Sequence, residues 1–332
     1  MMAAKPVVPA SFFGMVLGLV GLGDCWRVAA KAWGYSHAID EAVMAVAFLV
    51  WLLLCVLYVG KWLWARDEAI AELNHPVQSC FIGLCGVATM LAAVAIAPPS
   101  ASGLPVVLAV AGGVITLAYG VYFTARQWTG ERELESASPA FYLPTVAGNF
   151  VSSFVASYFG YETLGQLFLG AGMFSWLALE SLITHRLSFV KAMAPPLRPA
   201  MGIMLAPPVV GCLAYLFATG GVSGGKPDLF AQALLGYGLL QLAMLLRLLP
   251  WIAKQPFGAS YWAFSFGVTA LAFDAIVFML RGETGYIEWL AMGLFVLANL
   301  TMAILIVGTL WRLAQGKLQP PRLIAPLNIS ME

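Results

Sequence analysis

The sequence predicts an all-α integral membrane protein, and three observations support that fold class. Of the 332 residues, 61% are hydrophobic and only 10% are charged, whereas a soluble domain carries about 25% charged residues. The mean hydropathy is +0.87. Runs of about 20 mostly apolar residues, each able to cross a hydrocarbon layer of about 30 Å, recur from one end of the sequence to the other. The short alternating segments typical of a transmembrane barrel are absent from the sequence. We therefore expect residues 1–332 to form a single transmembrane domain.

Hydropathy divides the chain into ten transmembrane helices. Linkers after the odd-numbered spans are mostly short, and linkers after the even-numbered spans are longer and polar. The odd-numbered spans begin about 56–67 residues apart, a spacing that indicates five repeated helical hairpins. The expected spans are residues 10–31, 38–60, 76–97, 103–125, 143–160, 162–183, 199–219, 229–249, 259–280 and 286–311.

Small and helix-breaking residues concentrate in the odd-numbered spans. The first span carries Gly14, Gly18 and Gly21 along one helical face. The seventh contains the pair Pro207–Pro208, where we expect a kink because neither residue can donate a hydrogen bond to the preceding turn. Close helix packing explains any single glycine in a membrane. The concentration of helix-breaking residues in alternate spans instead favours an inner set of helices beside a water-filled path. Backbone N–H and C=O groups that lose their helical hydrogen bonds are tolerated at membrane depth beside such a path.

The basic residues predict the orientation of the chain. Of 17 Lys and Arg residues, 13 lie in the N-terminal tail or after even-numbered spans. The other four lie after odd-numbered spans: Arg27, Lys31, Lys226 and Arg281. By the positive-inside rule, both termini are expected in the cytoplasm. The net charge of +1 argues against nucleic acid as a partner.

Few residues at membrane depth could carry chemistry. The five cysteines lie in apolar runs without metal-ligating neighbours, and the three histidines lie at span ends. No catalytic motif is present in the sequence, so we expect no enzyme activity, no metal and no cofactor. Asp24 and Arg27, three residues apart, are expected to pair. Asp274 lies well inside the ninth span, and we interpret it as a capped or neutral carboxyl near the outer interface.

The start of the ninth span predicts a constriction. Phe264 and Phe266 stand there among Ala259, Ala263 and Ala270, so one or two large rings are surrounded by very small side chains. Ordinary aromatic burial would give the same composition. Alternatively, a ring swung across a narrow lumen would block it by steric exclusion and dewetting rather than by charge.

Seven stretches together resemble a known family. They are residues 12–18 (FFGMVLG), 75–76 (HP), 142–150 (YLPTVAGNF), 168–172 (FLGAG), 205–207 (LAP), 236–238 (GYG) and 261–268 (YWAFSFGV). In unbroken order they resemble the TehA family of bacterial tellurite-resistance proteins, shared with the slow anion channels of plant guard cells and yeast malic-acid transporters. The resemblance covers about residues 10–315.

The resemblance implies ten helices in five hairpins with quasi-fivefold symmetry, the odd helices lining a central pore and the even ones forming an outer layer. It also implies a homotrimer with one pore per protomer, in the bacterial inner (plasma) membrane in contact with lipid. It places the occluding phenylalanine of the family at Phe266. The expected pore lining is Phe13, Gly14, Gly18, Phe81, Val146, Phe150, Pro207, Ala263 and Ala270.

The predicted function is a gated, passive channel for small inorganic or organic anions. A lumen of small residues offers no fixed negative charge, and an anion must shed part of its hydration to cross it, so large and weakly hydrated anions are expected to pass most easily. The alternative is a secondary carrier for tellurite, malate or another small oxyanion or dicarboxylate. Asp274 motivates this alternative, because coupled carriers place ionisable groups at membrane depth.

Overall fold

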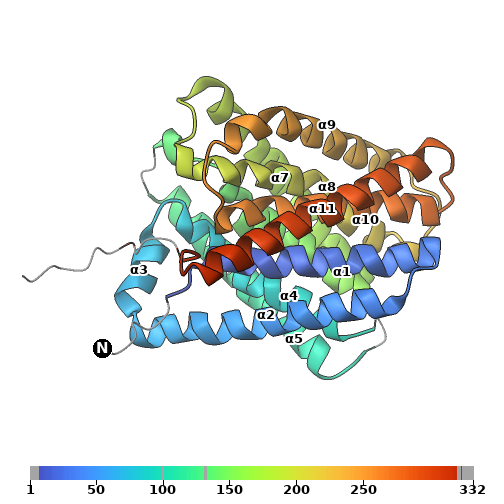
Figure 1. Cartoon of the computed structure of the whole chain (residues 1–332), viewed down its shortest axis with the longest axis horizontal. Helices are drawn as coiled ribbons and strands as arrows, with labels where there is room; N and C mark the ends of the chain where they lie inside the picture. Colours follow the sequence, from blue (N-terminus) through green and yellow to red (C-terminus); the bar gives the residue numbers. More distant parts are fainter. Residues whose placement is uncertain (1–6, 99–100, 131–132, 320–322, 324–332) are drawn as a thin grey trace, which may run out of the picture.

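The computed structural model describes residues 7–98, 101–130, 133–319 and 323. Across these ranges the chain forms helices and no strand, which confirms the predicted all-α class. The long helices run roughly side by side along the longest axis of the molecule (Figure 1). The first described residues, the end of the last helix and the short helix α3 (Arg66–Asn74) gather at one end, here termed the cavity end (Figure 1).

Five inner segments start at the cavity end, and each begins with a short non-α stretch that continues into an α-helix. Four of these stretches are 3₁₀ turns, wound more tightly than an α-helix, and η5 is a π turn, wound more loosely. Prolines interrupt the regular hydrogen-bond ladder in η5 and η6. The segments are η1 and α1 (Ala10–Phe13, Gly14–Trp33), η2 and α4 (Gln78–Phe81, Leu84–Ile96), η5 and α6 (Leu143–Ala147, Gly148–Tyr158), η6 and α8 (Pro195–Leu205, Ala206–Ala218), and η8 and α10 (Ala259–Phe264, Ser265–Leu280).

The inner helices close into a ring. α1 packs against α4, α4 against α6, α6 against α8, α8 against α10, and α10 returns to α1. Four of these segments are long and apolar enough to cross a membrane, and 72–83% of an apolar 18-residue stretch in each is buried within the protein. The inner layer is therefore shielded from the surroundings by a second layer.

The outer layer consists of five long helices whose exposed residues are mostly large and apolar. Only 17–33% of an apolar 18-residue stretch in each is buried. Each packs on the inner helix that precedes it in the chain and on the next inner helix around the ring. They are α2 (His37–Trp64), α5 (Leu104–Trp128), α7 (Glu162–Phe189), α9 (Leu229–Ile252) and α11 (Tyr286–Ala314). Short turns η3 (Leu134–Ser136), η4 (Pro139–Phe141) and η7 (Gly221–Ser223) complete the linkers.

Within the described ranges, nine helices are long and apolar enough to span a membrane. The expected fifth span, residues 143–160, corresponds to η5 and α6, and its helical stretch from Leu143 to Tyr158 falls short of 18 residues. At the expected kink of the seventh span, the chain changes from the 3₁₀ turn η6 to α8 at Ala206. Pro207 and Pro208 thus lie in the first turn of α8, where a missing N–H costs little.

The basic residues separate between the two ends of the helices. Arg27, Lys31, Lys226 and Arg281 lie at the far end, opposite the cavity end, and the described members of the larger group lie at the cavity end. Lys5, Arg132 and Arg322 fall outside the described residues. The expected ion pair between Asp24 and Arg27 is confirmed, with Oδ1 and Nη1 3.2 Å apart.

A close backbone contact between the layers is glycine-mediated and gives a stability prediction. A Cβ added to Gly86 of α4 would lie 2.5 Å from the carbonyl oxygen of Gly112 on α5, and one added to Gly112 would lie 2.6 Å from the carbonyl oxygen of Gly86. We expect Gly86→Ala to lower the free energy of unfolding by about 1–3 kcal/mol, because two backbones must separate. Thermal unfolding in detergent measures it. Gly170→Ala on α7, where nothing lies within 4 Å, is the control, and an equal loss in both would contradict the prediction.

Candidate pore

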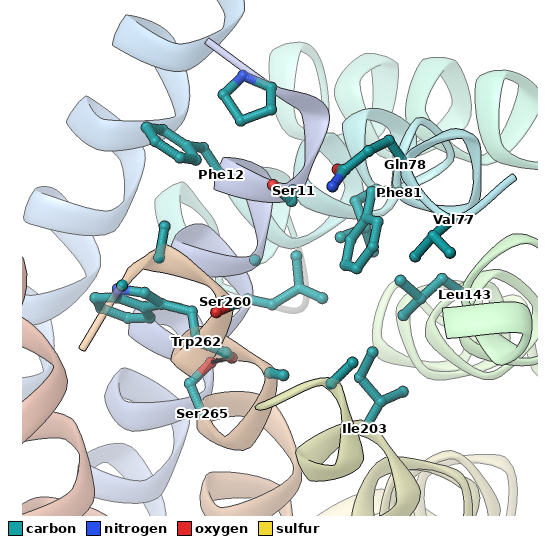
Figure 2. A pocket seen from close by; sticks show the side chains of 18 of the residues that line it. Ser11, Phe12, Val77, Gln78, Phe81, Leu143, Ile203, Ser260, Trp262 and Ser265 are labelled. Carbon is teal, nitrogen blue, oxygen red and sulfur yellow. Dashed lines mark hydrogen bonds between the residues drawn. The ribbon is translucent and has the colours of Figure 1, made fainter. Parts of the chain in front are cut away.

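A cavity of about 520 Å³ enters the protein between the five inner segments at the cavity end. Every inner segment contributes to its wall. Figure 2 shows side chains from each of them around the space: Ser11, Phe81, Leu143, Ile203 and Ser260. The cavity therefore lies inside the ring rather than in a surface groove between two helices.

The wall of the cavity is mostly apolar, and small or cyclic side chains widen it. Seven of the residues predicted to line or close a pore border this cavity: Gly14, Phe81, Val146, Phe150, Pro207, Ala263 and Phe266. Phe12, Leu143 and Ile203 also border it and were not among the predicted residues. The sequence identifies the inner segments but does not say which face of a short non-α turn points inward.

Three other predicted lining residues lie outside this wall. Phe13 is buried with its ring 5.7 Å from that of Tyr58 on α2, so it points outward from the ring axis. A Cβ on Gly18 would collide with Ser265, because α1 and α10 approach each other closely there. Ala270 is buried one turn beyond Phe266, the last residue of α10 in the wall.

Phe266 is the last residue of α10 that borders the cavity. Its ring is only partly buried although its neighbours Ser265 and Gly267 are buried, so the ring has free space on one side. A Cβ built on Gly21 would come within 3.3 Å of the ring, which places the ring beside α1. The position thus combines a large ring, open space on one side and a close glycine on the other.

Phe150 borders the cavity but its ring is held in a different way. Cβ atoms built on Gly172 of α7 and on Gly211 of α8 would lie 2.6 Å and 3.1 Å from the ring. The Trp176 ring meets it edge-on at 6.4 Å between centroids. Phe150 is therefore packed in a notch between α7 and α8, whereas Phe266 has room to move.

A buried charged network forms part of the cavity's rim. Glu72 of α3 accepts hydrogen bonds at Oε2 from Lys61 Nζ (2.9 Å) and from the Tyr58 hydroxyl (3.0 Å), and at Oε1 from the Ala10 backbone N–H (2.9 Å). Glu72 and Lys61 are 1% and 3% exposed. The network ties the start of η1 to α2 and α3. In the sequence both charges fall in the polar linker after the second expected span, and hydropathy does not reveal tertiary partners.

Asp274 lies apart from the cavity. It is fully buried in α10, and the weak thiol donor of Cys212 is the polar group that faces its carboxyl from α8. The thiols of Cys25 on α1 and Cys212 on α8 lie near it. The carboxyl is enclosed by three inner helices, so of the two expected alternatives, a capped or a neutral carboxyl, the described part of the structure shows no cap at an interface.

His75 holds one wall of the cavity mouth and predicts a pH dependence. Its Nδ1 accepts hydrogen bonds from the N–H groups of Val77 and Gln78, both 3.1 Å long, and both residues line the cavity. Burial lowers the pKa of His75 below its ordinary value, partly offset by Glu72. The unfolded chain therefore binds a proton before the folded chain does. This stabilisation is complete above the ordinary pKa of about 6.5 and is lost as pH falls through the lower folded value.

We expect wild type to lose more stability between pH 7.5 and 5 than His75→Ala does, as measured by thermal unfolding at each pH. His185→Ala, at an exposed position on α7, should follow wild type. Identical pH profiles for wild type and His75→Ala would contradict the assignment of Nδ1 as an unprotonated acceptor.

Comparison with known proteins matches this architecture to one family. Residues 7–310 match a family model described as "Voltage-dependent anion channel". The chain is 33% identical over 311 residues to the tellurite resistance protein TehA homolog of Haemophilus influenzae, covering 93% of this chain and 92% of that protein. It is 25% identical to the guard cell S-type anion channel SLAC1 of Arabidopsis thaliana, covering 91% of this chain and 55% of that protein. An uncharacterized transporter of Methanocaldococcus jannaschii is 22% identical, with 81% of this chain and 83% of that protein covered.

The family match spans most of the chain, and the most similar of these relatives covers nearly all of it. The family contains channels and transporters rather than enzymes. The chain therefore belongs to the SLAC1/TehA family of anion channels and transporters.

Proposed function

We propose that the protein is a gated passive anion channel whose pore runs through each protomer between the five inner segments and is occluded by Phe266. One observation carries this proposal: an apolar cavity enters the ring of inner helices from one end, and a partly exposed phenylalanine, Phe266, is the last residue of α10 in its wall. A passive path needs weak binding, and a wall of this kind binds weakly.

The charges around the cavity support an anion as the permeating species. The cations Lys61, Arg312 and Lys317 and the carboxylates of Glu68 and Glu72 border its mouth. Glu72 is paired with Lys61, and Glu68 accepts a hydrogen bond from the Leu323 N–H. The described lining residues that belong to the five inner segments are uncharged. An anion entering here meets three cations and two hydrogen-bonded carboxylates at the mouth, and no fixed negative charge between the inner segments. Large, weakly hydrated anions should pass best, because they lose least on dehydration.

The test is the reversal potential of the opened channel. In a planar bilayer with a tenfold potassium chloride gradient, current through Phe266→Ala should reverse close to the chloride equilibrium potential. A reversal potential near the potassium equilibrium potential would refute an anion channel. A current that persists undiminished after chloride is replaced by a large impermeant anion would refute it as well.

Several finer features belong to the same proposal. The pore would be lined by the odd-numbered helices of a ten-span, single-domain protomer, and three protomers would associate in the inner (plasma) membrane. Both termini would be cytoplasmic, because most of the basic residues lie at the cavity end. In this orientation the cavity opens to the cytoplasm.

A secondary carrier is the second candidate, and Asp274 is the observation that favours it. A buried carboxyl faced by a thiol and by no cation among the described residues is a potential proton site at membrane depth. Under the channel proposal, Asp274→Asn should leave anion flux and its dependence on a pH gradient unchanged within about twofold, because passive flow needs no proton. Uptake into proteoliposomes driven by an imposed pH gradient measures this. Loss of gradient-driven uptake in Asp274→Asn, with the protein folded, would instead support the carrier.

A further inference from the structure

We propose that the far half of the pore axis carries a second closure, built from Phe154, Phe217 and Phe273, which acts in series with Phe266. The inference rests on the proposed channel function. It concerns the part of the ring beyond the cavity, to which neither the sequence pattern nor the relatives' names assign a role.

Helical spacing places the three rings on the axis side of their helices. Each stands seven residues after a residue that borders the cavity: Phe154 after Ala147, Phe217 after Val210, and Phe273 after Phe266. A step of seven residues rotates a side chain about the helix axis by two full turns minus about 20°. Each ring therefore faces almost the same way as the cavity residue before it. Phe217 and Phe273 lie about 10 Å beyond Val210 and Phe266, and Phe154 lies about 6 Å beyond Phe150; these are the last cavity-lining residues of their helices.

The three rings also touch one another across the ring of helices. Phe154 of α6 and Phe217 of α8 meet edge-to-face with centroids 4.6 Å apart. Phe217 and Phe273 of α10 stack with centroids 6.1 Å apart. Since α8 lies between α6 and α10, the Phe217 ring bridges two helices that are not neighbours in the ring. Such contacts fill the space inside the inner layer.

A fourth aromatic side chain ties this layer to a further inner helix. Tyr158 lies 6.0 Å from Phe154 between ring centroids, and its hydroxyl donates to the carbonyl of Ala97, the residue that caps α4, at 2.7 Å. The aromatic layer is thus attached to α4, α6, α8 and α10, and a small motion of these helices would change its packing.

Burial distinguishes the ring that can move from those that cannot. Phe154 and Phe273 are 2% and 3% exposed, whereas Phe217 is only partly buried. Phe217 therefore has space beside it, as Phe266 has at the cavity floor. Two apolar constrictions in series each exclude water from the path. When one of them is removed by mutation, the other still limits the current.

The test compares single and double variants in planar bilayers at equal protein density. Phe217→Ala alone should conduct like wild type, since Phe266 still closes the path. Phe266→Ala/Phe217→Ala should carry about fivefold or more current than Phe266→Ala. The matched control is Phe266→Ala/Phe174→Ala, because Phe174 is an exposed ring on α7 and its loss should add nothing.

The outcomes separate the two proposals. If the double variant conducts no more than Phe266→Ala, the second closure is refuted while the channel stands. If no variant conducts anions, the channel function itself fails. If Phe217→Ala alone conducts as well as the double variant, the series arrangement is wrong.

A second measurement leaves Phe217 intact and so does not depend on folding of the double variant. Ala270 lies between the two closures, four residues after Phe266 and three before Phe273. In Phe266→Ala/Ala270→Cys, a small charged thiol reagent added at the cavity end should inhibit the current about tenfold faster than the same reagent added at the far end. Phe266→Ala alone gives the background from native cysteines. Equal rates from both ends would overturn the second closure.

Discussion

Replacing Phe266 with progressively smaller side chains is expected to raise anion current in the order Phe, Leu, Val, Ala. The ring borders the floor of the cavity and has free space on one side, so each loss of volume should widen the constriction and ease its wetting. We expect Phe266→Ala to exceed wild type by about tenfold or more, and Phe266→Leu to fall between them. Macroscopic current at fixed voltage and equal protein density measures the series.

The neighbouring ring supplies the matched control. Phe264 is also partly buried, but it packs on η6, where a Cβ added to Gly202 would lie 2.7 Å from the ring. Phe264→Ala should therefore leave the current near the wild-type level. The gate assignment fails if Phe264→Ala opens the path as well as Phe266→Ala, or if current is independent of the volume at position 266.

Removing the carboxylate of Glu72 is expected to cause the largest loss of stability. Glu72→Ala leaves the buried Lys61 ammonium without its partner and removes the acceptor of the Tyr58 hydroxyl and the Ala10 N–H. Breaking one side of a buried ion pair costs about 3–5 kcal/mol. We expect a loss of that size in the free energy of unfolding, measured by chemical denaturation in detergent. Glu41→Ala, at an exposed position on α2, should change it little.

A double variant distinguishes an unpaired charge from simple loss of packing. Lys61→Met/Glu72→Leu removes both charges while keeping side-chain volume, and buried ion pairs replaced in this way often retain stability. We expect it to recover much of the loss seen in Glu72→Ala. If the double variant is as unstable as Glu72→Ala, the unpaired Lys61 charge is not the cause.

The sequence carries enough information for the layers of this fold but not for the details of the cavity. Hydropathy and the concentration of Gly and Pro in alternate spans predict an inner and an outer set of helices, because burial in a membrane protein depends on close packing of small residues. The short ion pair of Asp24 and Arg27 follows from helical spacing alone.

Two features could not be predicted because they depend on tertiary partners. The choice of Phe12 rather than Phe13 for the cavity wall depends on the 3₁₀ geometry of η1, which rotates side chains differently from an α-helix. The pairing of Lys61 with Glu72 joins α2 to α3 through a bend at Ala65, and nothing in a polar linker indicates such a bend. The enclosure of Asp274 by α1 and α8, which carry the Cys25 and Cys212 thiols, likewise depends on tertiary packing that the sequence does not reveal.

The shared direction of the inner helices has an electrostatic consequence. α1, α4, α6, α8 and α10 all begin at the end from which the cavity enters. Each α-helix carries a partial positive charge of about half an elementary unit at its N-terminus, from peptide dipoles that point along its axis. Five such dipoles converge on one apolar space, where the low dielectric strengthens their field. The backbone itself therefore makes this space favourable for negative charge, so the walls need no permanent cation to attract it.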